Sequence, residues 1–192
     1  MVVALAYCDR KNERKLKKLC KKDSKQLTAS QRQQILTELR EFCGFLEVCL
    51  HADRITSEME KISLNDIEAR AMADLVKQVK DADFMIDLPD RYSWIFKERM
   101  AKCGVEKFEA EHKADENYPI VAAASIYAKV RRDAEVERIK AETKVDFGSG
   151  YPSDPKTRTA LSGREMQEKI SVHIRKKWKT LENLKQTKLI FD

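Results

Sequence analysis

Asp87 is an acidic residue in a place where a carboxylate can serve a reaction. It follows the apolar residues of DFMIDLP at 83–89, and its charge is out of character with those neighbours. Strand ends in α/β proteins commonly open onto an active-site crevice. The stretch therefore indicates either a site carboxylate at position 87 or an ordinary acid in the turn before Pro89.

A second acidic position lies at Asp115 and Glu116, within HKADENYPIVAAAS at residues 112–125. The pair precedes a predicted helix, whose free backbone N–H groups can hold a phosphate, although acids in a first turn also simply favour the helix dipole. Mg²⁺ prefers hard oxygen ligands, and two such ions can activate water and stabilise the leaving oxygen of a phosphodiester. We interpret Asp87 and Asp115 as half of a two-metal site, to which Glu116 does not contribute.

The segment GSGYPSDPKTR at residues 148–158 carries groups that suit a ribose. Gly148 and Gly150 let the backbone approach a ligand, and Tyr151 offers a flat ring and a hydroxyl. Such a side chain can stack on a sugar or base and hydrogen-bond a 2′-hydroxyl, the group that separates RNA from DNA. A rigid surface turn with a packed tyrosine is the alternative interpretation.

Hydroxyl and ammonium groups that can bind phosphate occur in two places. Ser24 and Lys25 lie in DSKQLT at residues 23–28, and Ser125 follows three alanines in the predicted helix. Those alanines let the helix approach a sheet or a ligand closely. Tight helix-on-sheet packing explains the alanines equally well.

The charge of the chain is modest but unevenly distributed. The 192 residues include 38 Lys and Arg against 32 Asp and Glu, a net charge of +6, and 42% hydrophobic residues, which can build one core. Two basic clusters lie near the chain ends and fit either solvated helix faces or a polyanion partner. Their members are Lys11, Arg14, Lys15, Lys17, Lys18, Lys21, Lys22 and Lys25, then Arg175, Lys176, Lys177, Lys179, Lys185 and Lys188.

The five cysteines are odd in number and include no CxxC pair. This usage predicts neither a zinc site nor a disulfide framework, and it is typical of a reducing cytoplasm. No apolar span is long enough to cross a membrane, and the first eight residues, MVVALAYC, indicate a buried strand rather than a signal peptide.

Hydrophobic periodicity predicts alternating strands and helices, hence an α/β sandwich with a mixed sheet. The strands are expected at 1–8, 45–52, 83–89 and 105–112, the helices at 30–43, 63–79, 91–103 and 119–142, a loop at 148–158, and basic helical segments after it.

The order of these motifs resembles archaeal ribonuclease HII, the type 2 ribonuclease H family, from Met1 nearly to Asp192. HKADENYPIVAAASIYAKV and GSGYPSDPKTR are its most specific strings, and DSKQLT, SLNDIE, MIDLPDR and KKWKT occur in the expected order. The resemblance implies a ribonuclease H-like catalytic domain at 1–160, with helices flanking a mixed central sheet, and a C-terminal helical segment and tail at 161–192.

The resemblance also implies a reaction and its residues. The expected activity is Mg²⁺- or Mn²⁺-dependent cleavage of the RNA strand of RNA–DNA hybrids and incision 5′ of ribonucleotides embedded in duplex DNA. Asp87 and Asp115 match the third and fourth metal acids of the family, and Tyr151 matches the tyrosine at the ribose. Lys25, Ser24 and Ser125 match polar groups along the phosphate path.

One family motif is not found. Family members open with a strand bearing Asp-Glu-Ala-Gly-Arg-Gly, which supplies two further metal carboxylates, whereas MVVALAYC resembles the strand that follows it. The first strand is therefore expected to be missing, and metal binding to be weakened. A catalytically impaired binder of RNA–DNA duplexes is accordingly the alternative function.

The C-terminal QTKLIF at residues 186–191 is similar to the start of a sliding-clamp-binding peptide, through Gln186, Leu189 and Phe191. An ordinary amphipathic tail is the alternative, because short motifs match by chance. A clamp-associated accessory protein is thus a third possible function. Relatives imply a monomer.

Overall fold

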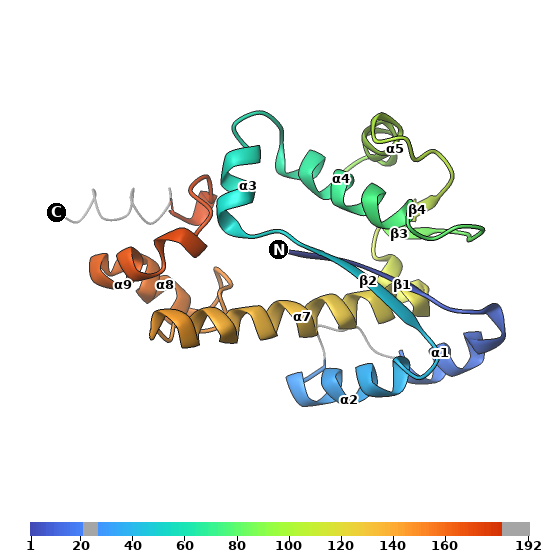
Figure 1. Cartoon of the computed structure of the whole chain (residues 1–192), viewed down its shortest axis with the longest axis horizontal. Helices are drawn as coiled ribbons and strands as arrows, with labels where there is room; N and C mark the ends of the chain where they lie inside the picture. The colour runs from blue at the N-terminus through green and yellow to red at the C-terminus, as the bar shows by residue number, and fades with distance from the viewer. Residues whose placement is uncertain (21–26, 182–192) are drawn as a thin grey trace. The chain divides into compact units, whose positions relative to one another are not determined.

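The computed structural model describes residues 1–20 and 27–181 of the chain, whose elements are shown in Figure 1. The chain divides into two compact units. The sheet unit comprises Val2–Cys49 and Ser63–Arg131, and the helical unit comprises Met1, Leu50–Ile62 and the residues from Arg132 onward. The predicted domain boundary at residue 160 stays a prediction.

In the sheet unit the first two strands pair as predicted from their apolar runs. Strand β1 (Val2–Tyr7) lies antiparallel to β2 (Gly44–Cys49), with Tyr7 opposite Gly44 at the end of the ladder. A Cβ atom at residue 44 would meet the far end of the Tyr7 ring, so glycine lets this ring lie across the neighbouring strand.

The other two strands are shorter than predicted. Strand β3 (Met85–Asp87) lies parallel to β4 (Glu109–Glu111). Parallel and antiparallel pairing therefore both occur, as expected of a mixed sheet. In the described residues, however, they form two separate two-stranded sheets, β1–β2 and β3–β4.

The helices of the sheet unit pack around these strands (Figure 1). They are α1 (Glu13–Leu19), α2 (Ala29–Leu39), α4 (Leu64–Val76), α5 (Ser93–Lys102), α6 (Ala114–Asn117) and the first part of α7 (Pro119–Thr143). Helix α1 was not predicted, because lysines dominate its sequence and it has few apolar residues to mark a buried face.

Two helix starts are set by capping boxes, in which a side chain and a backbone N–H satisfy each other reciprocally. The box at Ser63 and Asp66 confirms the predicted start of α4. The predicted start of α2 at Ser30 is wrong, because Thr28 caps the helix through Gln31 and α2 begins at Ala29.

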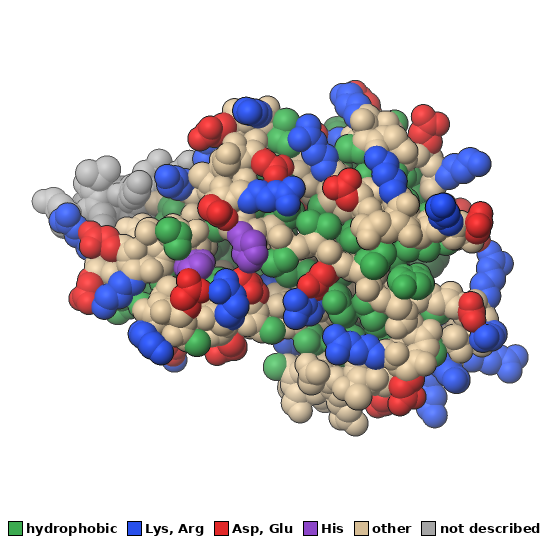
Figure 2. All heavy atoms as spheres, viewed as in Figure 1, with side chains coloured by type: hydrophobic (Ala, Val, Ile, Leu, Met, Phe, Trp, Pro, Cys, Tyr) green, Lys and Arg blue, Asp and Glu red, His purple; other side chains and the backbone are tan. Residues whose placement is uncertain are grey.

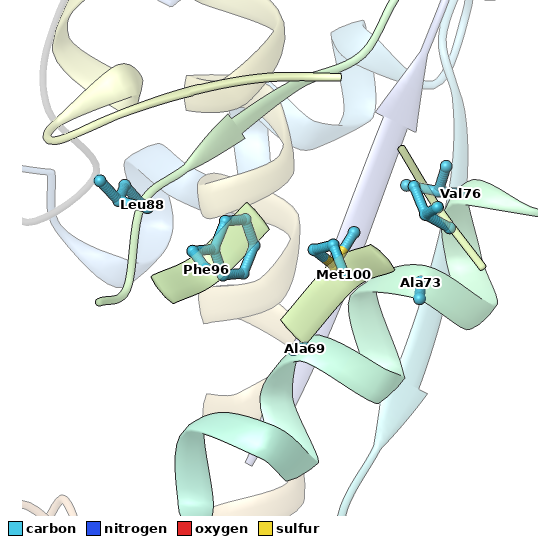
Figure 3. Packing of buried hydrophobic residues seen from close by; sticks show 7 residues of the cluster. Ala69, Ala73, Val76, Leu88, Phe96 and Met100 are labelled. Atoms are coloured by element: carbon cyan, nitrogen blue, oxygen red, sulfur yellow. The ribbon is translucent and has the colours of Figure 1, made fainter. Parts of the chain in front are cut away.

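The main core of the sheet unit lies between α4 and α5 (Figure 3). Ala69 and Ala73 give α4 a smooth face against which the fully buried side chains of Phe96 and Met100 pack. Phe96 also meets Phe108 edge to face, with ring centroids 5.7 Å apart. Buried aromatic pairs of this kind stabilise a core beyond their area alone.

A second core cluster of the sheet unit gathers three thiols. Cys43 is buried there with Leu16 of α1 and Ala123 of α7, and Cys8 and Cys20 pack against it. Burial raises the pKa of Cys43 to about 12 and the pKa of Cys20 to about 11. No disulfide joins any of the five cysteines, all of which lie in the described residues.

The helical unit is built from α3 (Ala52–Glu58), the rest of α7, α8 (Pro155–Ser162), α9 (Arg164–Lys169) and the 3₁₀ turn at Ser171–His173. Its core contains Val145, Phe147, Ala160 and Ile170. Across the described ranges, no helix is both long and apolar enough to cross a membrane.

The prediction that residues 148–158 form a loop throughout is wrong at its C-terminal end. Helix α8 begins at Pro155, whose fixed φ and missing N–H suit the first helical position, and Asp154 caps it by accepting from the Lys156 N–H. Pro155 thus marks the start of a helix and does not interrupt one.

Replacing Phe96 with alanine should destabilise the chain by about 3–5 kcal/mol, because it leaves a cavity between α4 and α5. Urea denaturation followed by circular dichroism measures the loss. The exposed neighbour Lys97→Ala is the control and should change the free energy of unfolding by less than about 0.5 kcal/mol. An equal effect of the two substitutions would contradict this account of the core.

Candidate active site

The side chain of Asp87 stands at the end of β3, on the face of the strand opposite to the core. Side chains alternate along a strand. Ile86 packs against the main core, so Asp87 points the other way and is exposed. The Leu88 N–H donates to the Glu111 carbonyl at 2.9 Å, which extends the pairing with β4 past Asp87 and fixes the strand end.

A hydrogen bond joins Asp87 to the backbone that carries the second candidate acid. The Ala114 N–H donates to Oδ1 of Asp87 at 3.1 Å. Lys113 adopts a left-handed conformation, with φ of 58°, and turns the chain from β4 into α6. Asp115 is the next residue and is only 8% exposed. The two candidate carboxylates therefore come from adjoining parts of the sheet unit.

Asp115 and Glu116 precede the predicted long helix, as expected, and a short helix that was not predicted contains them. Both lie inside the short helix α6, and the predicted long helix α7 starts separately at Pro119. Glu116 pairs with Lys113 at 3.0 Å near the surface. This pairing gives Glu116 a structural role on the outer side of the turn.

Glu111 is an acid of this region that the sequence analysis missed. It lies directly opposite Asp87 in the β3–β4 register. Its carboxylate accepts from the Asn117 amide at 2.7 Å and from the Tyr118 hydroxyl at 3.4 Å, and its charge raises the pKa of Tyr118. Only the register of β3 and β4 shows that Glu111 lies opposite Asp87.

The loop after Asp87 is anchored by a buried acid. Asp90 is 5% exposed and accepts from the Asn65 amide at 2.6 Å. Its second oxygen forms an ion pair with Nε of Arg99 at 3.2 Å that is not aligned as a hydrogen bond. Arg99 also binds Asp66, so the loop, α4 and α5 share one charged network. Removing one partner of such a buried pair strongly destabilises a protein.

Few side chains near Asp87 could act as metal ligands, and those that could are acidic. Throughout residues 1–20 and 27–181, no three His, Cys, Asp or Glu side chains gather as a metal site would require. Asp87 and Asp115 supply hard oxygen atoms, the donors that Mg²⁺ takes from one or two carboxylates while water and phosphate fill its other positions. The described residues thus offer two acids on adjoining segments, without a third possible metal ligand gathered beside them.

The predicted phosphate ligands are placed only in part. Ser125 lies half-buried in α7 within the sheet unit, two residues beyond the fully buried Ala123. Ser24 and Lys25 lie outside the described residues, as do the tail residues of the predicted clamp peptide.

Tyr151 belongs to the helical unit and is 40% exposed. The guanidinium of Arg132 lies over its ring, 3.8 Å from the centroid. A cation at this distance is attracted by the ring face and fixes the ring orientation. The Arg132 contact therefore holds a tyrosine ring that is 40% exposed in a defined orientation.

The turn that carries Tyr151 is held by hydrogen bonds to its backbone. The Gly150 N–H donates to the Thr157 hydroxyl at 2.9 Å, and the Ser149 N–H donates to the Asp154 carboxylate at 2.6 Å. Gly148 has a positive φ of 70°, and a Cβ there would collide with Asp154. The glycine is therefore required by the turn itself.

The basic cluster on α1 is partly neutralised within the chain. Lys17 pairs with Glu13 at 2.6 Å, and Lys15 lies over the ring of Phe42. The space-filling view shows cationic and anionic side chains interspersed over the visible face (Figure 2). On this face, the charges therefore do not single out one polyanion-binding surface.

Comparison with solved structures shows which known fold this chain shares. One chain of the structure of the PCNA:RNase HII complex from Archaeoglobus fulgidus matches with a TM-score of 0.84 and 37% identity, over 95% of this chain and 88% of that one. Ribonuclease H2 from Pyrococcus horikoshii OT3 matches with a TM-score of 0.79 and 30% identity, over 97% and 98%. The expected ribonuclease H-like fold is confirmed.

Sequence comparison narrows the class to one family. The family model described as Ribonuclease HII matches residues 1–181. Ribonuclease HII of Archaeoglobus fulgidus is 38% identical over 193 residues, which cover 98% of this chain and 91% of that protein. The chain belongs to the ribonuclease HII family, whose members are hydrolytic endonucleases with ribonuclease H activity.

The turn of Tyr151 should respond to acid through Asp146. A hydrogen bond from Lys156 and another from the Gly148 N–H lower the pKa of Asp146 from 3.8 to about 2. Because the pKa is lower in the folded chain, this stabilisation is present above pH 3.8 and is lost as the pH falls through 2.

Lys156→Gln should therefore raise the pKa of Asp146 towards 3.8. An NMR titration of the carboxyl carbon measures the shift, and Lys144→Gln, at an exposed lysine of the same segment, is the control. A midpoint of Asp146 that is the same with and without Lys156 would contradict the described turn.

Proposed function

We propose that the chain cleaves the RNA strand of RNA–DNA hybrids and nicks duplex DNA 5′ of embedded ribonucleotides, with divalent cations held by Asp87 and Asp115. The observation that carries the proposal is the hydrogen bond of 3.1 Å between the Asp87 carboxylate and the backbone N–H immediately before Asp115. It brings an exposed acid and a buried acid to adjoining positions of one unit.

The cation, Mg²⁺ or Mn²⁺, would activate water and stabilise the leaving oxygen of the phosphodiester when bound. Asp87, exposed at the strand end, would face the substrate, and the buried Asp115 would hold its position in α6. Two metal ions normally require more carboxylates than these two. The proposal of a two-metal reaction therefore depends on further oxygen ligands besides the acids described.

Substrate recognition is proposed to involve the polar groups identified in the sequence. Tyr151, oriented by Arg132 at 3.8 Å, would pack at the ribose. Lys25, Ser24 and Ser125 would meet phosphates. We further propose that the protein acts as a monomer in the cytoplasm, which suits its five reduced thiols.

The second candidate function is binding of RNA–DNA duplexes with impaired catalysis. It is favoured by the small donor set, since no group of three metal-binding side chains gathers in the described parts of the chain. Salt-sensitive binding without nicking would distinguish this function from the first, because phosphate contacts weaken as salt rises.

Asp115→Asn should abolish metal-dependent nicking while leaving duplex binding intact. The test is a DNA duplex with one ribonucleotide, incubated with Mg²⁺ or Mn²⁺ and, separately, with EDTA. We expect nicking to fall at least about 100-fold, because loss of a direct ligand should cost no less than loss of an outer one.

Glu116→Gln is the matched control and should retain the rate, because Glu116 pairs with Lys113 instead. Circular dichroism should show that both variants are folded. Equal rates for the chain and Asp115→Asn would refute the proposed role of Asp115, and nicking in EDTA would refute metal dependence.

A sliding clamp is proposed as a protein partner. The relative from Archaeoglobus fulgidus was solved in complex with PCNA. In this chain the tail residues Gln186, Leu189 and Phe191 would supply the contact, which would also allow the accessory role considered above.

Removing residues 186–192 should therefore eliminate retention of the chain on an immobilised archaeal sliding clamp, because the apolar side chains of the tail would be lost. A pull-down measures this, with Lys188→Ala as the control that keeps Leu189 and Phe191. Retention of the shortened chain at full strength would exclude the tail as the binding segment.

A further inference from the structure

The loop between β3 and α5 exposes two large aromatic side chains close to Asp87 in sequence. Tyr92 is 47% exposed and Trp94 is 64% exposed, and their rings stack with centroids 6.4 Å apart and planes 18° apart. The guanidinium of Arg91 lies 5.3 Å from the centroid of the Tyr92 ring. Exposed apolar groups that cluster in this way mark interaction sites more often than single exposed residues do.

The loop presents these rings from a fixed backbone. Asp90, directly before Arg91, is buried and paired with Asn65 and Arg99. The first turn of α5 is closed by the Ile95 N–H, which donates to the Tyr92 carbonyl at 3.2 Å. The fully buried Phe96 then holds the helix in the core. The backbone that carries the aromatic pair is therefore fixed by buried contacts, which reduces the backbone entropy lost on binding.

The surroundings of the pair are mainly cationic. Arg91 and Lys97 are both exposed, and Nε2 of His112 lies 3.3 Å from the Arg91 carbonyl. The nearby acids are already engaged, since Glu98 pairs with Lys102 and Glu116 pairs with Lys113. A flat apolar surface with a cationic rim is complementary to a sugar–phosphate backbone.

The separation from Asp87 suits a duplex that also reaches that carboxylate. Trp94 follows Asp87 by seven residues, and an extended chain spans at most about 3.6 Å per residue, or about 25 Å in total. One turn of a duplex is about 34 Å long. One turn of a duplex is longer than this greatest separation, so a duplex bound at Asp87 is long enough to reach the aromatic pair.

We propose that Arg91, Tyr92 and Trp94 form a subsite for the backbone of the nucleic acid duplex, within one helical turn of the phosphate at Asp87. The aromatic faces pack on sugar rings, and Arg91 pairs with a phosphate. This subsite rests on the proposed function, because it needs the chain to bind a duplex.

The test uses Trp178→Phe as the parent chain, so that Trp94 is the one remaining tryptophan. An RNA–DNA hybrid of about 10–12 base pairs, roughly one turn, is titrated in EDTA, so that binding is measured without cleavage. We expect a saturable change in Trp94 emission. In a parallel anisotropy titration, Trp94→Ala should weaken binding roughly 5- to 50-fold with an unchanged salt dependence.

Arg91→Ala should weaken binding and reduce the slope of log affinity against log salt by about one, because one phosphate contact is lost. Arg164→Ala, at an exposed arginine of α9, is the control and should keep the slope. Trp94→Phe keeps a flat ring and should retain most of the affinity. Far-ultraviolet circular dichroism should be the same for all variants, because these side chains are exposed.

Three results would overturn the subsite. The first is that Trp94→Ala binds the hybrid as tightly as the parent chain does. This result would leave the proposed function intact. Another is a Trp94 emission that depends on protein concentration without nucleic acid, which would assign the surface to a second copy of the chain. The third is a parent chain that binds no hybrid, which would remove the proposed function as well.

Discussion

The hydrogen bond from the Ala114 N–H to the Asp87 carboxylate is the constraint on which the candidate site depends. It joins the end of β3 to the start of α6 and satisfies a backbone donor that the short helix leaves open. It forms only because β3 and β4 pair in one register, with Asp87 opposite Glu111. A shift of one residue would turn Asp87 towards the core.

The surrounding structure supports this bond from several directions. Ile86 holds β3 against the main core, and the buried Asp90 anchors the loop that follows. On the other strand, Glu111 accepts from Asn117, which fixes α6 relative to β4. Asp90 and Glu111 therefore support the structure around Asp87, and Asp87 itself is exposed to solvent.

Local signals in the sequence were enough to predict the long elements and the positions of Asp87 and Asp115. The start of α4 could be predicted because its capping box lies within four residues. The roles of Glu111 and Asp90 could not be predicted from local signals. The position of Glu111 depends on the strand register, and the burial of Asp90 depends on its ion pair with Arg99 of α5. Pro155 was misread because proline both stops and starts helices, and only Asp154 as its cap distinguishes the two.

The packing of Cys8, Cys20 and Cys43 in one core cluster determines how readily these thiols react. Oxidants and alkylating reagents attack the ionised form of a thiol. Because burial raises the pKa of Cys43 to about 12, its thiol is almost entirely un-ionised at neutral pH. Burial of this thiol beside α1 and α7 therefore slows its reaction with peroxide.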